Sequence, residues 1–408
     1  DRTSRGLGDV YKRQMIDNKH ENLLANYDWS FPVPIAYGPG RLREMGEHAT
    51  NFELTKPLIV TDQGSAGLPF IDTLQQALLS AGIGSEVFAE VAPNPRDSDI
   101  VLARNAYLEG GHDSVIAIGG GSGMDAGKST ALTAHNQCDI WQFDFDRDVP
   151  SLPADHIFPK LICIPTTAGT GAETESTAMV THSERGMKLC VWHPELKPSL
   201  TLLDPEITLG LPAALTAWTG IDAMVHAIEA YCVPDYHPMC DGVALEALAL
   251  IGRWLPNAVE EPGNLVARGG MQVGACLAGV SFLKGLGLVH AISHMVGADF
   301  DTHHGLTNAI VLPAVLKFNA PAIDDKLPAM CAALGLQSVD FESFYAAICQ
   351  LLDRLSVPVT LAEIGVPAEA ARALAEKAHQ DAAAGTNPRP ADVATIERLI
   401  LEAITVGR

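Results

Sequence analysis

The residue pattern of this chain changes once, near residue 205, and that change constrains the fold more than any other feature. Between residues 31 and 203, short β-branched runs alternate with segments of helical spacing. The runs at 57–62, 86–91, 113–118 and 160–165 predict strands, and those at 71–81 and 97–109 predict helices. Strands separated by helices are typical of parallel β-α-β units.

After residue 205 almost no β-branched run occurs, and Ala-rich and Leu-rich helical spacing takes over. The predicted helices are 213–231, 239–254, 265–283, 308–318, 341–355, 369–384 and 390–406. The sequence therefore predicts an α/β domain at 15–205, followed by an all-α domain at 206–408.

The segment 1–14 (DRTSRGLGDVYKRQ) precedes the first methionine, Met15. It contains basic residues but lacks the apolar segment of a secretory signal. We expect a non-native leader with Met15 as the native start, and a genuine N-terminal extension is the alternative.

Composition excludes several classes of function. Lys and Arg number 27 against 49 Asp and Glu, a formal net charge of −22. Such a body repels phosphate backbones and anionic membrane surfaces, so we expect no nucleic-acid or membrane partner. No uninterrupted apolar run approaches the roughly 18 residues of a membrane helix. The eight cysteines form no C-x-x-C pair, which favours reduced thiols and a cytoplasmic protein over a disulfide framework or a thiolate zinc site.

A glycine-rich loop at 119–128 (GGGSGMDAGK) follows a predicted strand and opens a predicted helix. Glycines let backbone N–H groups approach an anion at the positive end of a helix. The loop fits the dinucleotide fingerprint but lies on a later strand than usual, and Ser122 stands where a P-loop requires glycine. Taken alone, the loop could also be an ordinary turn.

Two other strand ends strengthen the dinucleotide interpretation. Asp62 ends the first clear strand, where its carboxylate can bind ribose hydroxyls and repel a 2′-phosphate, which favours NAD over NADP; the alternative is a helix cap. The second loop, 165–171 (PTTAGTG), places hydroxyls and glycines at another strand end. Two such loops suit a ligand with two phosphates.

Metal-ligand residue types cluster in the second half. Asp222 and His226 are four residues apart on a predicted helix, so both side chains share one face. His290 and His294 repeat this spacing, and His304 follows. A carboxylate with several imidazoles suits a divalent first-row metal.

Four segments resemble the iron-containing (group III) alcohol dehydrogenases, in order along nearly the whole chain. They are 119–128, 165–173, 220–229 (GIDAMVHAIE) and 290–305, followed by the closing 387–390 (NPRP). The resemblance implies the fold of that family and of dehydroquinate synthase. In that fold a Rossmann-like, dinucleotide-binding domain, here 15–205, precedes a helical domain, here 206–408, that binds metal and substrate. It implies NAD and Fe²⁺ as cofactors, with Zn²⁺ as the alternative ion, and a small alcohol or aldehyde as substrate. It also suggests a homodimer or larger homo-oligomer.

The resemblance assigns residues to roles. The metal ligands would be Asp222, His226, His290 and His304; the glycine after His304 selects it over His303, which could still be a ligand or an outer-sphere group. Phe282 would form a wall of the substrate pocket or pack in the core. The dinucleotide contacts would be Asp62, Asn94, Gly121, Ser122, Thr166, Thr167, Thr170 and Lys188, of which Lys188 could instead be a surface lysine.

The expected reaction moves a hydride between a small primary alcohol, or its aldehyde, and NAD. A bound dication would act as a Lewis acid on the oxygen, and His294, one helical turn beyond His290, would relay the proton. The alternative is a related metal-dependent enzyme of the same fold, such as a hydroxyacid–oxoacid transhydrogenase or a glycerol-dehydrogenase-like enzyme.

Overall fold

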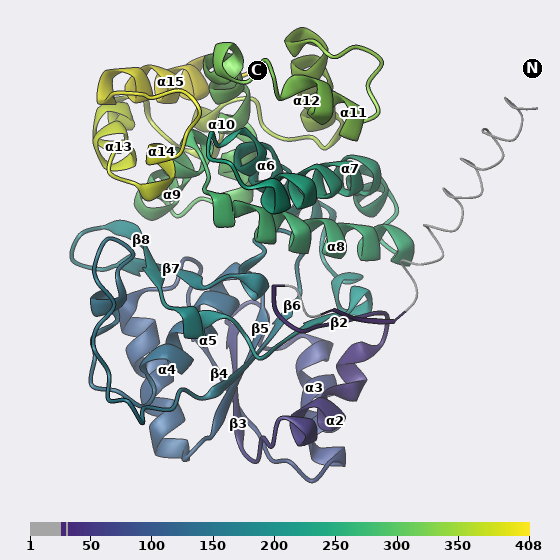
Figure 1. Cartoon of the computed structure of the whole chain (residues 1–408), viewed down its shortest axis with the longest axis vertical. Coiled ribbons are helices and arrows are strands. Elements are labelled where there is room, and N and C mark those ends of the chain that lie inside the picture. The colour runs from purple at the N-terminus through teal and green to yellow at the C-terminus, as the bar shows by residue number, and fades with distance from the viewer. Residues whose placement is uncertain (1–25, 30–31) are drawn as a thin grey trace, which may run out of the picture.

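A computed structural model describes residues 26–29 and 32–408 of the chain. The expected leader at 1–14 and Met15 lie outside the described residues. A part with a central sheet occupies the lower half of Figure 1, and helices form the upper half. This arrangement confirms the predicted class, α/β followed by all-α.

The lower part is built on a seven-stranded sheet of order β1-β2-β9-β6-β5-β3-β4. Every pairing is parallel except that of β1 with β2. The strands are β1 (Tyr27–Trp29), β2 (Ile35–Tyr37), β3 (Pro57–Asp62), β4 (Glu86–Val91), β5 (Ser114–Gly119), β6 (Lys160–Pro165) and β9 (Leu200–Leu203).

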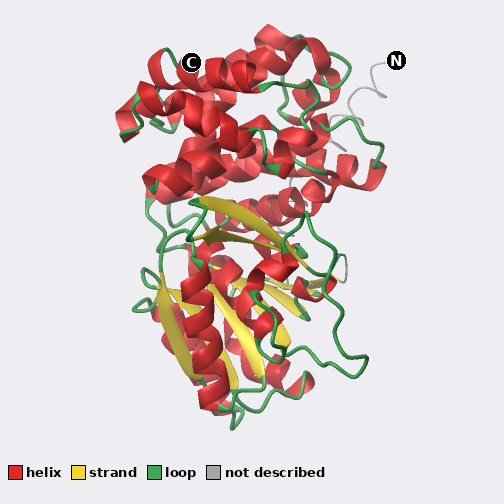
Figure 2. Ribbon diagram, turned by 90° about the vertical axis from the view of Figure 1, so that its left-hand side faces the viewer, coloured by secondary structure: helices red, strands yellow, loops and turns green. Residues whose placement is uncertain are grey.

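Helices cover both faces of this sheet (Figure 2). Alternate residues of β5 face opposite layers, because successive side chains of a strand point to opposite sides. Val115 belongs to the apolar cluster under α4 (Asp97–Gly110) and α5 (Gly121–Thr133). Its neighbour Ile116 belongs to the cluster under α2 (Met45–Asn51) and α3 (Pro69–Ser80). Burial on both faces explains why the strands are almost continuously apolar.

A separate antiparallel hairpin was not predicted from the sequence. It consists of β7 (Thr177–His182) and β8 (Met187–Trp192). Its mixed polar and apolar residues give no buried run to detect, because only one face of each strand is covered. The hairpin contacts the helical part: the Lys377 ammonium donates to the carbonyl oxygen of Gly186, 3.2 Å away.

The upper part contains the helices α6 (Ala213–Cys232), α7 (Pro238–Glu260), α8 (Leu265–Ser281), α9 (Leu288–Phe300), α10 (His304–Asn319), α11 (Leu327–Ala333), α12 (Phe341–Arg354), α13 (Ala371–Ala378), α14 (Ala382–Gly385) and α15 (Val393–Thr405). No helix range was predicted for α9 or α11, although His290 and His294 were expected to lie one helical turn apart. The single helix predicted at 369–384 is wrong. It divides into α13 and α14 because Asp381 accepts the backbone N–H of Ala383 and caps a new helix.

One described segment, Leu265–Lys284, is long and apolar enough to cross a membrane by length and composition. In the structure 72% of its apolar window is buried, as in a core helix. The sequence predicted this helix at 265–283 but no uninterrupted apolar run of membrane length, because Arg268 interrupts the segment. The Arg268 guanidinium is itself buried and donates to the hydroxyl of Thr216 at 2.8 Å.

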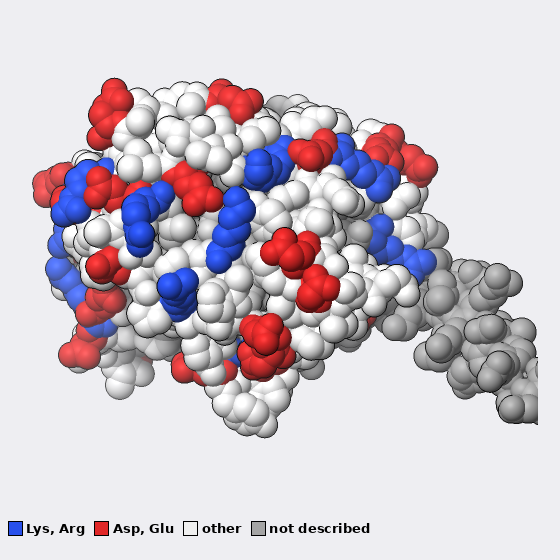
Figure 3. Space-filling model, turned by 90° about the horizontal axis from the view of Figure 1, so that it is seen from above, with Lys and Arg blue, Asp and Glu red and all other residues white. Residues whose placement is uncertain are grey.

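Charges of both signs are interspersed over the face of the helical part seen from above (Figure 3). Ion pairs between neighbouring helices account for some of this mixing, including Arg354 with Glu260 at 2.6 Å. All eight cysteines are free thiols.

Candidate active site

A cavity of about 1570 Å³ lies between the sheet and the helical part. Open α/β sheets bind ligands beyond the carboxyl ends of their strands, and β3, β5 and β6 all end at this cavity. Every residue that the sequence assigned to cofactor, metal or proton transfer lines it: Asp62, Asn94, Gly121, Ser122, Thr166, Thr167, Thr170, Lys188, Asp222, His226, His290, His294 and His304.

The two predicted anion loops lie against each other. The backbone N–H of Thr166 donates to the carbonyl oxygen of Gly119 at 2.9 Å, which joins the ends of β5 and β6. A Cβ atom on Gly121 would stand 2.7 Å from Cγ2 of Thr170. A larger residue at 121 would therefore force Thr170 to move, and the start of α5, with Gly121 and Ser122, lines the cavity. This is the arrangement that suits a diphosphate.

Asp62 is held in a turn at the end of β3. Its carboxylate accepts the Ser65 backbone N–H at 3.0 Å and the Ser65 hydroxyl at 2.8 Å. The helix cap that the sequence left as the alternative is wrong, because α3 begins only at Pro69 with Leu68 as its N-cap. The carboxylate of Asp62 instead closes a turn and still lines the cavity beside Gly119.

Asn94 links the two parts of the chain. Its side-chain amide donates to Asp301 at 3.0 Å, and its oxygen accepts from the ammonium of Lys188 at 3.3 Å. Lys188, on β8, is not a surface lysine. Burial lowers its pKa, and the charges of Asp125 and Asp222 counteract this. A partly desolvated ammonium in this position suits an anionic ligand group.

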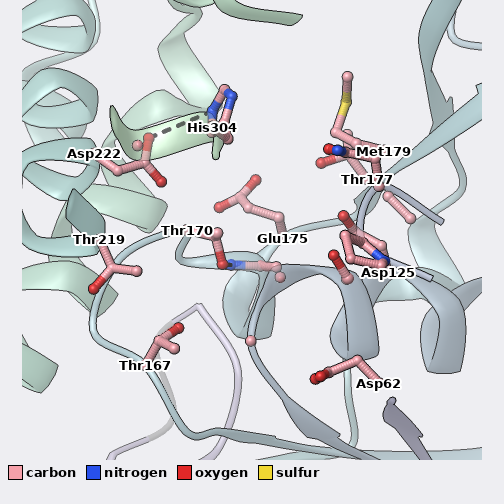
Figure 4. A pocket seen from close by; sticks show the side chains of 18 of the residues that line it. Asp62, Asp125, Thr167, Thr170, Glu175, Thr177, Met179, Thr219, Asp222 and His304 are labelled. Atoms are coloured by element: carbon pink, nitrogen blue, oxygen red, sulfur yellow. Dashed lines mark hydrogen bonds and ion pairs between the residues drawn. The ribbon is translucent and has the colours of Figure 1, made fainter. Parts of the chain in front are cut away.

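The metal-ligand residues come from three helices. Asp222 and His226 lie on α6, His290 on α9, and His304 is the first residue of α10. From Asp222 Oδ1, the Nε2 atoms of the three imidazoles lie 3.8, 3.6 and 3.4 Å away in that order. Figure 4 shows the Asp222–His304 pair at the edge of the cavity. The ligand atoms of Asp222, His226 and His290 all lie within 4.8 Å of one another.

The surroundings of Asp222 fit a cation. The amide nitrogen of Asn308 lies 2.6 Å from Asp222 Oδ1, 3.3 Å from His290 Nε2 and 3.2 Å from His304 Nε2. His290 Nε2 donates when that ring is protonated, so the two amide hydrogens serve Asp222 and His304. Among the described residues, the buried Oδ1 atom of Asn308 has no hydrogen-bond partner. The carboxylate of Asp222 and the Nε2 atoms of the neutral imidazoles are ligands that a divalent cation accepts.

Protonation of the cluster also suits a metal. Burial lowers the pKa of His226 to about 3 and that of His304 well below its ordinary value, so both imidazoles are neutral ligands. Burial alone would lower the pKa of His290, but hydrogen bonds to Asp222 and Glu229 outweigh it and raise the pKa to about 9. A metal ion would displace that proton.

Glu229 is a functional residue that the sequence did not assign. Its carboxylate accepts from His290 Nδ1 at 2.7 Å and from the backbone N–H groups of Gly287 and Val289 at 3.0 and 2.7 Å. It therefore fixes the start of α9 and turns Nε2 of His290 toward Asp222, the usual role of a carboxylate behind a metal-binding histidine. Its spacing on α6, seven residues after Asp222, was the available signal.

His303 and Phe282 occupy different positions around the cluster. The His303 imidazole accepts the backbone N–H of Leu306 at 3.4 Å, caps α10 and packs on Trp218 with ring centroids 5.1 Å apart. Phe282 lines the cavity with its ring 4.9 Å from that of His226. His303 is thus engaged outside the Asp222 cluster, whereas Phe282 forms one of its walls.

Comparison with known proteins identifies the chain. A sequence model described as iron-containing alcohol dehydrogenase matches residues 32–205, and the C-terminal model of the same family matches 216–404. The chain belongs to the iron-containing alcohol dehydrogenase family. As a member of that family it is an oxidoreductase of alcohols or aldehydes.

Relatives cover almost the entire chain. The NAD-dependent methanol dehydrogenase of Bacillus methanolicus is 33% identical over 91% of this chain and 98% of its own length. The 1,3-propanediol dehydrogenase of Klebsiella pneumoniae is 32% identical over 92% of this chain and 98% of its own length. The solved alcohol dehydrogenase from Oenococcus oeni superposes with a TM-score of 0.85 at 32% identity, covering 90% of this chain and 97% of that one.

Glu175 is a second residue that the sequence did not single out in this member of the iron-containing alcohol dehydrogenase family. Its side chain lines the cavity, as Figure 4 shows, yet the residue is only 2% exposed. Burial raises its pKa to about 8, although Lys128 and Lys197 oppose the shift.

Replacing Glu175 by glutamine is expected to flatten the pH dependence of stability. Between the ordinary pKa of 4.5 and about 8, the folded protein keeps a proton on Glu175 that the unfolded chain has released. The free energy of unfolding therefore falls as pH rises through this window. A glutamine side chain cannot titrate. Urea unfolding of the ligand-free Glu175→Gln variant should therefore show a smaller loss of unfolding free energy between pH 5.5 and 8 than the unmodified protein shows.

The exposed Glu184 supplies the matched control, and Glu184→Gln should keep the original slope. Burial also raises the pKa of Glu173 to about 7 and that of Asp125 to about 6. The unfolding free energy of Glu175→Gln should therefore still fall somewhat as pH rises. An unchanged slope in Glu175→Gln would show that Glu175 is ionised in the folded protein.

Proposed function

We propose that this chain oxidises a small primary alcohol, or reduces its aldehyde, by hydride exchange with NAD at a divalent iron site. The observation that carries the proposal is the buried group of Asp222, His226 and His290, with ligand atoms within 4.8 Å of one another. Both anion loops line the same cavity. A metal-dependent dehydrogenase needs its metal site and its dinucleotide site together in this way.

The dinucleotide is proposed to lie across the ends of β3, β5 and β6, within the predicted domain 15–205. When bound, NAD supplies the carbon that accepts or returns the hydride. The chain would hold it through the eight residues assigned above. Asp62 would bind the adenosine ribose, and the loops of Gly121, Ser122 and Thr166 to Thr170 would bind the phosphates. Asn94 and Lys188 lie toward Asp222 and would face the nicotinamide end.

The metal is proposed to be held by Asp222, His226, His290 and His304, all in the predicted domain 206–408. When bound, a dication supplies Lewis acidity toward the alcohol or carbonyl oxygen. Fe²⁺ is proposed because the family is iron-containing. Zn²⁺ is the alternative, because the same imidazole and carboxylate donors bind both ions. Glu229 would keep His290 oriented for either ion.

His294 is proposed as the proton carrier. It lines the cavity on α9, and its ring stacks on that of His304 with centroids 5.3 Å apart. It therefore lies beside the proposed ligands without being one of them, where it can take the hydroxyl proton of an alcohol. Phe282, whose ring lies beside that of His226, would form another wall of the cavity and exclude water.

The test is an aldehyde panel with NADH and Fe²⁺, followed at the nicotinamide absorbance. The relatives are named for methanol and 1,3-propanediol, so we expect short, uncharged aldehydes to be reduced fastest. A transhydrogenase of the same fold would instead turn over a hydroxy acid with an oxo acid and only catalytic NAD. Turnover of that pair without NADH consumption would replace the proposed function with this alternative.

Cytoplasmic location and a homodimer or larger homo-oligomer are also proposed. Free thiols support the first, and the second stays a prediction that solution mass measurement would check.

Replacing Asp62 by glycine is expected to relax the preference for NAD over NADP by tenfold or more, about 1.4 kcal/mol. The carboxylate repels a 2′-phosphate, and glycine removes the charge. Asp62→Asn is the matched variant, because its side-chain oxygen can still accept the Ser65 N–H and preserve the turn. Kinetics with both cofactors measure the preference. Equal use of NAD and NADP by the unmodified enzyme would contradict the assignment.

A further inference from the structure

Asp381 contacts His294 directly, although no cofactor or metal role has been assigned to it. Asp381 Oδ2 lies 2.8 Å from His294 Nδ1, and the two side chains are 8% and 9% exposed. Both residues line the cavity. A buried carboxylate at this distance forms a charge-assisted hydrogen bond with an imidazole.

The position of Asp381 is fixed by its second carboxylate oxygen and by the segment that follows it. Its second oxygen, Oδ1, accepts the backbone N–H of Ala383 at 2.9 Å. Further along the same segment, the hydroxyl of Thr386 donates to the carbonyl oxygen of Leu286 at 2.7 Å. Asn387 accepts the backbone N–H of Leu288, the first residue of α9, at 3.2 Å. The loop carrying Asp381 is thus tied to the helix carrying His294.

This contact determines which nitrogen of His294 carries hydrogen. Burial alone would raise the pKa of Asp381, but His294 outweighs it and the pKa is lowered, so Asp381 is an ionised acceptor. An ionised carboxylate cannot donate, so the 2.8 Å contact requires hydrogen on Nδ1 and leaves Nε2 as the nitrogen that can accept a proton.

We propose that Asp381 is the positioning residue of the reaction, which holds His294 with Nδ1–H toward itself and the basic Nε2 free for the substrate. In alcohol oxidation the hydroxyl proton passes to Nε2, and the hydride passes from carbon to NAD. The resulting imidazolium is stabilised by the Asp381 carboxylate and later releases its proton to water. This inference rests on the proposed function, because it assumes that His294 carries the proton.

Asp381→Asn tests the inference with little change of shape. The asparagine oxygen can still cap Ala383, but its NH₂ group donates to Nδ1 and favours the opposite tautomer, with hydrogen on Nε2. We expect kcat to fall by about 10²–10⁴-fold, with metal stoichiometry unchanged and KM for the alcohol altered only a few-fold. Asp392→Asn is the matched control, since Asp392 caps α15 by accepting from Thr395 at 2.8 Å. It should keep full activity.

A double-mutant cycle separates positioning from general structural damage. If Asp381 acts only through His294, Asp381→Asn should have little further effect in a His294→Ala background. If the two single losses of kcat multiply in the double variant, the inference is overturned. A kcat of Asp381→Asn within threefold of the unmodified enzyme would overturn it as well. A slow His294→Ala paired with an active Asp381→Asn overturns only the role of Asp381. A fully active His294→Ala contradicts the proton role in the proposed function itself.

A second measurement determines the tautomer in the unmodified protein and uses a variant only to assign the signal. Nitrogen-15 NMR of the unmodified protein, with His294 identified by comparison with His294→Ala, should show hydrogen on Nδ1 and none on Nε2. The opposite tautomer would overturn the inference.

Discussion

His290→Ala is expected to lose the bound divalent metal and to lower turnover by more than about 10³-fold, because Lewis-acid assistance contributes several kcal/mol. NAD binding should survive. The loops proposed to hold the dinucleotide belong to the sheet-containing part, whereas His290 lies on α9. Elemental analysis gives the metal content, and titration of NADH fluorescence gives the dinucleotide affinity.

The adjacent histidines provide the matched comparison. His304 Nε2 lies 3.4 Å from Asp222 Oδ1, whereas the His303 imidazole caps α10 and packs on Trp218. We therefore expect His304→Ala to lose the metal and His303→Ala to keep it. Stoichiometric metal in His290→Ala, or loss of metal only in His303→Ala, would contradict the ligand set.

His294→Ala is expected to keep the metal and NAD but to turn over about 10²–10⁴-fold more slowly, the usual contribution of a general acid–base group. The ring lies beside His304 and is held by Asp381, so its removal takes away the proton acceptor without removing a ligand. The measurement is kcat at saturating substrate together with metal content. A raised KM with unchanged kcat would mean that His294 only orients the substrate.

The parts of the fold that local sequence determines were predictable. Apolar runs such as the one predicted at 113–118 marked the buried parallel strands, because burial on both faces leaves no alternation. Glycines at the strand end marked the loop beside Thr170. The spacing of Asp222 and His226 placed both on one face of α6, where the structure has them.

Other features depend on contacts between segments far apart in the chain. Asp381 lies 87 residues from His294, so neither spacing nor periodicity could associate them. Glu229 is separated from His290 by 61 residues, and its position in a predicted helix gave no indication of its partner. The hairpin of β7 and β8 escaped prediction because its polar and half-buried residues resemble those of a loop.

Metal and NAD are proposed to act together, in one cavity, on one alcohol carbon. The most direct test follows deuterium from NADH labelled at nicotinamide C4 into the alcohol made from a short aldehyde, using protein stripped of metal and protein reloaded with Fe²⁺. We predict stoichiometric transfer of the label to the carbinol carbon by the reloaded protein and almost none by the stripped protein. Equal transfer by the stripped protein would contradict a catalytic role for the Asp222 cluster.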